Sequence, residues 1–172
     1  MLVAIFFGTL AFTMTSEWQL FENNDLQAFF PKLPKKQVQS LNTAIGKLEM
    51  NIYMYEAQSE DQDDNLVYGL ITTEYPDSII NSETIEDLES FFRNSIDGAV
   101  SNVKGKLIKE SEIKISGFPG REIKIDFKEG LAIIRMRLYL VKNKMIMQQT
   151  ITLTDKDNNP SIERYMNSLK LK

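Results

Sequence analysis

Polar and apolar residues alternate along several stretches of the chain, which is the pattern of a half-buried β-strand. In KLEMNIYMYEAQ, residues 47–58, leucine, methionine and isoleucine occupy every second position, and mainly polar residues and tyrosines occupy the others. Further strands are predicted in LVYGLITTEY, KLIKESEIKIS, REIKIDFK, LAIIRMRLYLV and KMIMQQTITL. The chain is therefore expected to be built mainly on β-strands.

The connections between the predicted strands of the second half are short, at 117–120, 129–130 and 142–143. Connections of this length join antiparallel neighbours, because a parallel return needs a crossover of about a dozen residues. An earlier extended segment, FFPKLPKKQVQS, contains Pro31 and Pro34. Proline lacks a backbone donor, which favours the edge of a sheet or the first position of a strand.

The stretch GFPGREIKI, residues 117–125, is predicted to form a hairpin corner at 117–120. Proline and glycine at the second and third positions of FPGR fit a type II turn, in which glycine supplies the positive φ. The strand that follows should direct Ile123, Ile125 and Phe127 into the core.

Two helices are predicted from apolar residues at helical spacing. The first begins after Thr84 as N-cap, has acidic residues in its first turn, and ends before Gly105. The second lies in NNPSIERYMNSLKL, with Pro160 in its first turn and one apolar face: Ile162, Tyr165, Met166 and Leu169. The predicted fold class is α+β, an antiparallel β-sheet with helices packed on it.

The 172 residues suffice for one domain with a full hydrophobic core and are too few for two domains that each have one. No side chain before Glu17 is charged, and MLVAIFFGTLAFTMT is too short to span a bilayer as a helix. We predict a signal peptide at 1–16 and a single exported domain, periplasmic or extracellular, without a membrane span at 17–172. The alternative is a cytoplasmic protein in which the apolar segment belongs to the fold. N-terminal sequencing of protein from its native host distinguishes the two.

Composition excludes several kinds of chemistry. The formal charge of −4 argues against a nucleic-acid partner, because phosphate contacts need clustered lysine and arginine. The chain has no cysteine and no histidine, so thiolate zinc sites, cysteine nucleophiles and Ser-His-Asp triads are impossible. The acidic stretches EDQDDN and DKDNN lack the glycine and the final glutamate of a calcium loop. We expect no catalytic, metal or cofactor site.

One candidate binding surface follows from the strand pattern. If the strands at 47–58 and 131–141 share a sheet, their polar faces combine five tyrosines and arginines: Tyr53, Tyr55, Arg135, Arg137 and Tyr139. Tyrosine and arginine are favoured at binding hot spots. The alternative is a half-covered face along which the arginine stems lie.

The order of the elements and several motifs resemble the PsbP-like fold. These motifs include GFPGREIKI at 117–125, RMRLYLVKNKMIMQQ at 135–149 and YMNSLKL at 165–171. They are similar to uncharacterised secreted bacterial proteins of that fold, over residues 17–172. The resemblance implies an α/β/α sandwich and roles in binding and assembly, as in extrinsic photosystem subunits and a nuclear-transport factor. The metal-binding histidines of the photosynthetic branch have no counterpart here.

We therefore predict a non-catalytic exported domain that binds a protein partner or a component of the cell envelope. One alternative is a small hydrolase with two carboxylates roughly 5–9 Å apart in a concave cleft. Another is a carrier of a small apolar ligand, because the eight methionines suit adaptable binding sites. A carrier would need an enclosed cavity of several hundred Å³.

Overall fold

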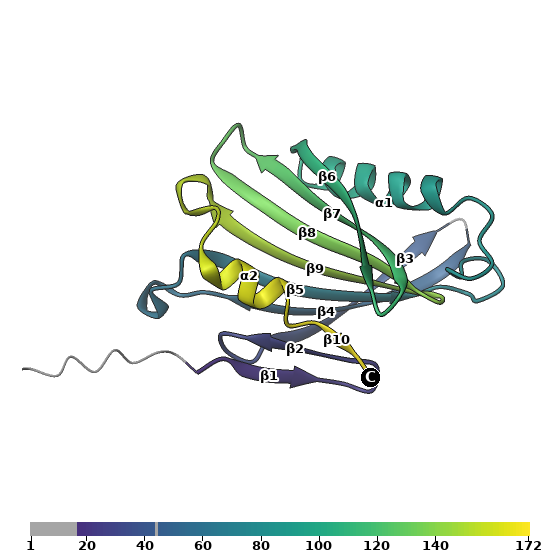
Figure 1. Ribbon diagram of the computed structural model, residues 1–172, viewed down its shortest axis with the longest axis horizontal. Coiled ribbons are helices and arrows are strands. Elements are labelled where there is room, and N and C mark those ends of the chain that lie inside the picture. The colour runs from purple at the N-terminus through teal and green to yellow at the C-terminus, as the bar shows by residue number, and fades with distance from the viewer. Residues whose placement is uncertain (1–16, 44) are drawn as a thin grey trace, which may run out of the picture.

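The computed structural model describes residues 17–43 and 45–172. It is an α+β protein of mostly antiparallel β-structure with two α-helices (Figure 1). The predicted signal peptide at 1–16 lies outside the described residues and stays a prediction. Within the described residues, no helix has the length and apolar character needed to cross a membrane.

Seven strands form one antiparallel sheet in the order β3-β4-β5-β9-β8-β7-β6. These strands are β3 (Lys35–Thr43), β4 (Gly46–Glu56), β5 (Asn65–Glu74), β6 (Lys106–Ile115), β7 (Phe118–Phe127), β8 (Ala132–Val141) and β9 (Lys144–Leu153). The alternating stretches of the sequence all lie in this sheet. The segment after Pro34 is an edge strand, as predicted.

A second, three-stranded sheet was not predicted. It consists of β1 (Gln19–Glu22), β2 (Leu26–Phe30) and β10 (Lys170–Leu171), in the order β1-β2-β10. Every second side chain of β2 is fully buried: Leu26, Ala28 and Phe30. The small sheet therefore contributes directly to the core.

The helices are α1 (Leu88–Asn102) and α2 (Pro160–Met166). The predicted cap of α1, Thr84, is wrong, because Asp87 accepts a hydrogen bond from the Ser90 backbone N–H at 2.9 Å. Thr84 lies instead in a preceding turn closed by Asn81. The predicted start of α2 is confirmed, since Pro160 occupies its first turn.

The predicted type II turn at 118–121 is also wrong. Ile115 pairs with Phe118, so the two-residue turn consists of Ser116 and Gly117, whose φ values are 49° and 90°. Two positive φ angles characterise the type I′ turn, whose twist matches that of the flanking strands. Pro119 and Gly120 therefore belong to β7.

The large sheet is covered on both faces (Figure 1). We call them the α1 face, on which α1 packs, and the α2 face, on which α2 and the small sheet pack. The core between α1 and this face consists of Phe92 and Ile96 from the helix and the following sheet residues: Ile123, Ile125, Ile134, Met136, Leu138, Leu140 and Met145. The α/β/α sandwich implied by the resemblance is not confirmed, because α2 shares its layer with the small sheet.

Candidate functional site

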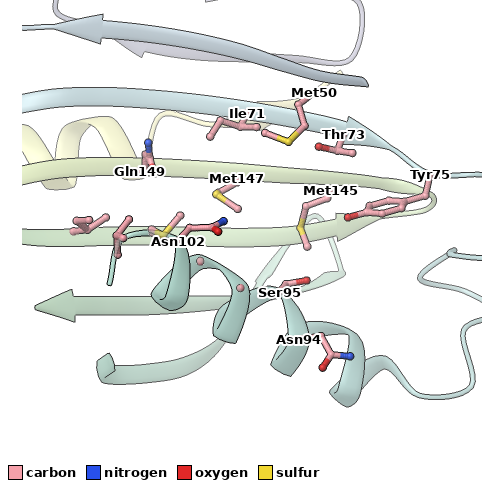
Figure 2. Close-up of a pocket in the computed structure, with 15 residues that line it drawn as sticks. Met50, Ile71, Thr73, Tyr75, Asn94, Ser95, Asn102, Met145, Met147 and Gln149 are labelled. Atoms are coloured by element: carbon pink, nitrogen blue, oxygen red, sulfur yellow. The ribbon is translucent and has the colours of Figure 1, made fainter. Parts of the chain in front are cut away.

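A groove of about 350 Å³ lies between α1 and the α1 face of the large sheet (Figure 2). Its sides are the second half of α1 and the strands β4, β5, β8 and β9. Four methionines line it: Met50, Met136, Met145 and Met147. Their unbranched, polarisable thioether side chains can adjust to the shape of an apolar ligand.

The flank of α1 that faces away from the groove carries ion pairs to the sheet. Toward β6 and β7, Arg93 pairs with Glu110 at 2.8 Å. Arg121 pairs with Glu89, and its guanidinium lies 4.9 Å from the centre of the Phe92 ring. The residues that α1 presents to the groove are uncharged and mostly small: Asn94, Ser95, Gly98, Ala99, Asn102 and Val103. The ion pairs and the groove therefore occupy opposite sides of the helix.

Two glycines shape the groove. A side-chain carbon at Gly98 would meet no atom within 4 Å beyond its own helical turn and chain neighbours, so this position faces open space. At Gly69 a side-chain carbon would come within 2.9 Å of Cγ of Gln149, the residue opposite on β9. The missing side chain at Gly69 therefore lets Gln149 lie across β5 beside the groove.

The polar groups of the groove are uncharged. The Ser95 hydroxyl donates to the Phe91 carbonyl at 2.8 Å, which occupies it within the helix. Burial raises the pKa of Tyr75, which keeps its hydroxyl protonated, and its ring packs edge-on against Phe91. The lining also includes the Thr73 hydroxyl and the side-chain amides of Asn94, Asn102 and Gln149.

The lining restricts the kind of ligand. None of the described residues that line the groove is charged, so a charged ligand would lose water without gaining a counter-ion. The volume falls within the usual range for small-molecule sites. The groove is open to solvent on one side, unlike the enclosed cavity that a carrier was expected to need. A ligand could therefore bury an apolar part and leave one end in water.

These residues were not among the predicted site residues. The sequence signal was present in Gly98, because a glycine inside a helix costs about 1 kcal/mol relative to alanine. The alternation also placed Met50 on an apolar strand face. Neither signal shows that α1 leaves a gap beside β5, because that gap depends on tertiary packing.

The predicted Tyr/Arg surface lies on the α2 face. The structure brings its five residues together there, as the alternation suggested, but all three tyrosines are at most 8% exposed: Tyr53, Tyr55 and Tyr139. The Tyr53 ring packs 4.5 Å from the Phe21 ring of β1. The small sheet and α2 cover this face, so the tyrosines are not openly exposed, and partner binding by the five residues stays a prediction.

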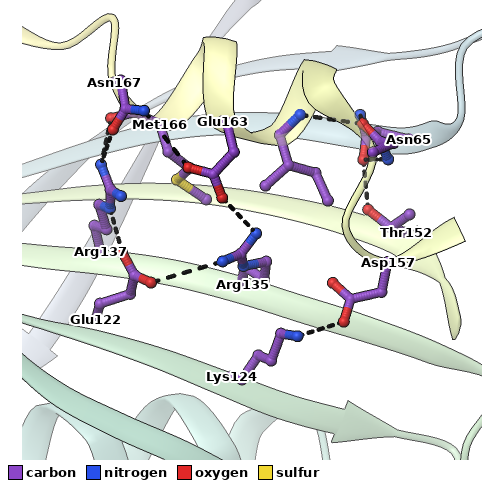
Figure 3. Close-up of polar contacts among 12 residues, drawn as sticks. Asn65, Glu122, Lys124, Arg135, Arg137, Thr152, Asp157, Glu163, Met166 and Asn167 are labelled. Carbon is purple, nitrogen blue, oxygen red and sulfur yellow. Dashed lines mark hydrogen bonds and ion pairs between the residues drawn. The ribbon is translucent and has the colours of Figure 1, made fainter.

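One ion pair and two hydrogen bonds hold α2 against this face (Figure 3). Arg135 pairs with Glu163 of α2 at 3.0 Å. Arg137 donates to the Met166 carbonyl at 2.8 Å and to Asn167 Oδ1 at 2.9 Å, and it also pairs with Glu122. The arginines therefore bridge the sheet and the helix.

The acidic stretches have structural partners. In the first, Asp61 accepts hydrogen bonds from Lys32, from the Tyr55 hydroxyl and from the Gln58 backbone at 2.8 Å. In the second, Asp157 pairs with Lys124. Over residues 17–43 and 45–172, no three carboxylates are grouped so as to hold a metal ion.

The hydrogen bonds to Asp61 predict a pH dependence. The bond from Lys32, then those from Tyr55 and Gln58, lower the pKa of Asp61 to about 2. A carboxyl whose pKa is lowered in the folded state stabilises the fold at pH values above its ordinary pKa of about 3.9. This stabilisation disappears as the pH falls through the pKa of the folded state. Asp61→Asn should therefore be less stable than wild type at neutral pH, and the difference should shrink as pH falls from about 4 to about 2. Urea midpoints at several pH values measure it, and a pH-independent difference would contradict the assignment.

The seven-stranded antiparallel sheet, with α1 on one face and α2 and a small sheet on the other, defines a protein of PsbP-like fold. The solution structure of cyanobacterial PsbP (CyanoP) from Synechocystis sp. PCC 6803 is similar, with a TM-score of 0.56 and 13% sequence identity. The match covers 96% of this chain and 98% of that one. No family model and no curated protein matches the sequence. At this identity the likeness shows the fold alone.

Proposed function

We propose that this chain is a non-catalytic binding protein whose groove takes a small, uncharged apolar molecule. The observation that carries the proposal is the groove of about 350 Å³ beside α1, which has four methionines and no charged side chain among its described lining residues. Burying an apolar ligand there gains about 25 cal/mol for each Å² removed from water. The methionines let one groove accept related shapes.

The ligand is expected to carry one uncharged polar group. The amides of Asn94, Asn102 and Gln149 can hydrogen-bond this group, while the apolar part lies along the methionines. A ligand without any polar atom would leave these amides to water at the open side, at little cost.

Two carboxylates of the first acidic stretch support a non-enzymatic role. A carboxylate hydrolase needs an acid whose pKa is raised, so that it can donate a proton near neutral pH. The pKa of Asp61 is instead lowered. The neighbouring Asp63 accepts hydrogen bonds from the Tyr68 hydroxyl at 2.8 Å and the Asn65 backbone at 2.9 Å. The hydrogen bonds of both aspartates therefore stabilise the loop.

Export of the domain and a partner in the envelope form the second part of the proposal. They rest on the uncharged segment at 1–16 and on the resemblance to secreted proteins. A protein that binds an apolar molecule in an open groove suits this setting, because such molecules dissolve poorly in aqueous compartments unless they are bound.

Fluorescent probes test the groove. The neutral probe N-phenylnaphthylamine should bind with a stoichiometry of one and increase in fluorescence. The anionic probe anilinonaphthalenesulfonate should bind at least about tenfold more weakly, because the groove offers no cation. Equal binding of both probes, or binding of neither, would refute the proposed ligand class.

Two substitutions of Gly98 form a matched pair. Gly98→Ala adds one carbon in open space and should keep probe binding while stabilising the helix by about 0.5–1 kcal/mol. Gly98→Phe should fill the groove and weaken the neutral probe by about tenfold or more. Circular dichroism and thermal melting verify that both variants fold. If folded Gly98→Phe bound the probe like Gly98→Ala, the ligand would lie elsewhere.

A further inference from the structure

The two edges of the large sheet differ in their protection. Exposed edges present unpaired backbone groups to other chains, and proteins usually protect them with lysines, prolines or bulges. The β6 edge has such protection, because its pairing with β7 is interrupted between Leu107 and Lys109, and Lys106 and Lys114 lie near its two ends.

The β3 edge lacks these features over most of its length. Its nine residues pair with β4 in a regular register, without a bulge. From Gln37 to Thr43 the strand contains neither a charged residue nor a proline. Each of its side chains is exposed except that of Leu41, which is half-buried, and Val38 is 56% exposed. An unprotected edge of this length can accept another strand.

We propose that β3 pairs antiparallel with β3 of a second copy of this chain, which joins the two large sheets into one continuous sheet. This surface is distinct from the groove, so the inference does not depend on the proposed ligand. A twofold axis through the paired strands makes the contact self-complementary and closed.

The charges along β3 favour this occupant. When the pairing is centred on Gln39, Lys35 of each copy lies opposite Thr43 of the other, and Lys36 lies opposite Asn42. The lysines at the beginning of the strand therefore meet only neutral residues, and like charges directly opposite each other are avoided.

The apolar side chains of β3 also gain neighbours in this pairing. Val38 lies opposite Ser40, and Leu41 lies opposite Gln37, so each apolar side chain is covered by the aliphatic part of a polar one. The two Gln39 side chains face each other at the axis, where their amides can hydrogen-bond. The central part of the strand is thus compatible with its own copy.

Disulfide crosslinking tests the contact directly, because the natural chain has no cysteine. Full-length chain carrying Gln39→Cys should form a covalent dimer under mild oxidation, since the two introduced thiols meet at the axis. Lys114→Cys, on the protected β6 edge, is the matched control and should stay mostly uncrosslinked. Sedimentation of the wild-type chain should show a dimer at micromolar concentrations.

Two charged substitutions at Gln39 distinguish loss of the β3–β3 contact from misfolding. Gln39→Lys and Gln39→Glu should each be folded, as circular dichroism can verify. Their dimer dissociation constants, measured by sedimentation, should be at least about tenfold higher than that of the wild type, because like charges face each other at the axis. An equimolar mixture of the two variants should restore the dimer. The proposal is overturned if the wild type is monomeric, if the β6 control crosslinks equally fast, or if the mixture fails to associate. Pairing of β3 with a different protein by a monomeric chain would equally overturn it.

Discussion

Tyr165→Ala should lower the free energy of unfolding by about 3–5 kcal/mol, as expected for removing a large buried aromatic ring. The Tyr165 side chain is fully buried. Its ring packs edge-on against Phe30 of β2 at 5.0 Å and against Tyr68 of β5 at 5.2 Å between centroids. Its hydroxyl donates to the Gly69 carbonyl at 2.7 Å. One side chain of α2 therefore connects the small sheet to the large one.

Tyr165→Phe separates the ring from the hydroxyl. This variant keeps the aromatic packing and loses the hydrogen bond to Gly69, which should cost about 0.5–1.5 kcal/mol. Urea unfolding followed by circular dichroism measures both variants. If alanine cost no more than phenylalanine at this position, packing of the ring would contribute nothing, contrary to the assignment of α2 as part of the core.

Strand positions in the large sheet could be predicted because alternation is a local property. Ile123 and Ile125 are 2% and 0% exposed, as the sequence indicated. Alternation does not reveal which face is more deeply buried when both faces are covered. On β4 the tyrosine face was expected to be the polar one, yet Tyr53 and Tyr55 are 8% exposed while Met50 is half-buried.

The elements that were missed depend on distant residues. In the small sheet, β10 pairs with β2, so Leu171 lies opposite Leu26 at the other end of the chain. A five-residue strand such as β2 gives too short a pattern to indicate that partner. The turn at Ser116 and Gly117 was missed because Pro119 suggested a local turn, while pairing of Ile115 with Phe118 determines the actual one. The groove was missed for the same reason, since it is a gap between elements.

Arg137→Ala should lower the free energy of unfolding by about 3 kcal/mol, because it removes the central member of a largely buried polar network. The Arg137 side chain is 17% exposed and contacts Glu122, the Met166 carbonyl and the Asn167 side chain. The substitution leaves the carbonyl at the end of α2 without its donor. α2 should therefore detach from the sheet more readily in this variant than in the wild type.

Two further variants define the cause of that loss. Arg137→Lys should recover only part of the stability, because a guanidinium can reach several acceptors at once and an ammonium is a single point charge. Arg164→Ala, on the same helix, removes an arginine that stacks on Trp18 at 4.7 Å and should cost less than about 1 kcal/mol. Thermal melting and urea unfolding of the three proteins measure the order. If Arg137→Ala were as stable as wild type, the contacts of this arginine to α2 would be dispensable for the fold. Arg137 would then not anchor α2, and its role would have to be sought in binding a partner.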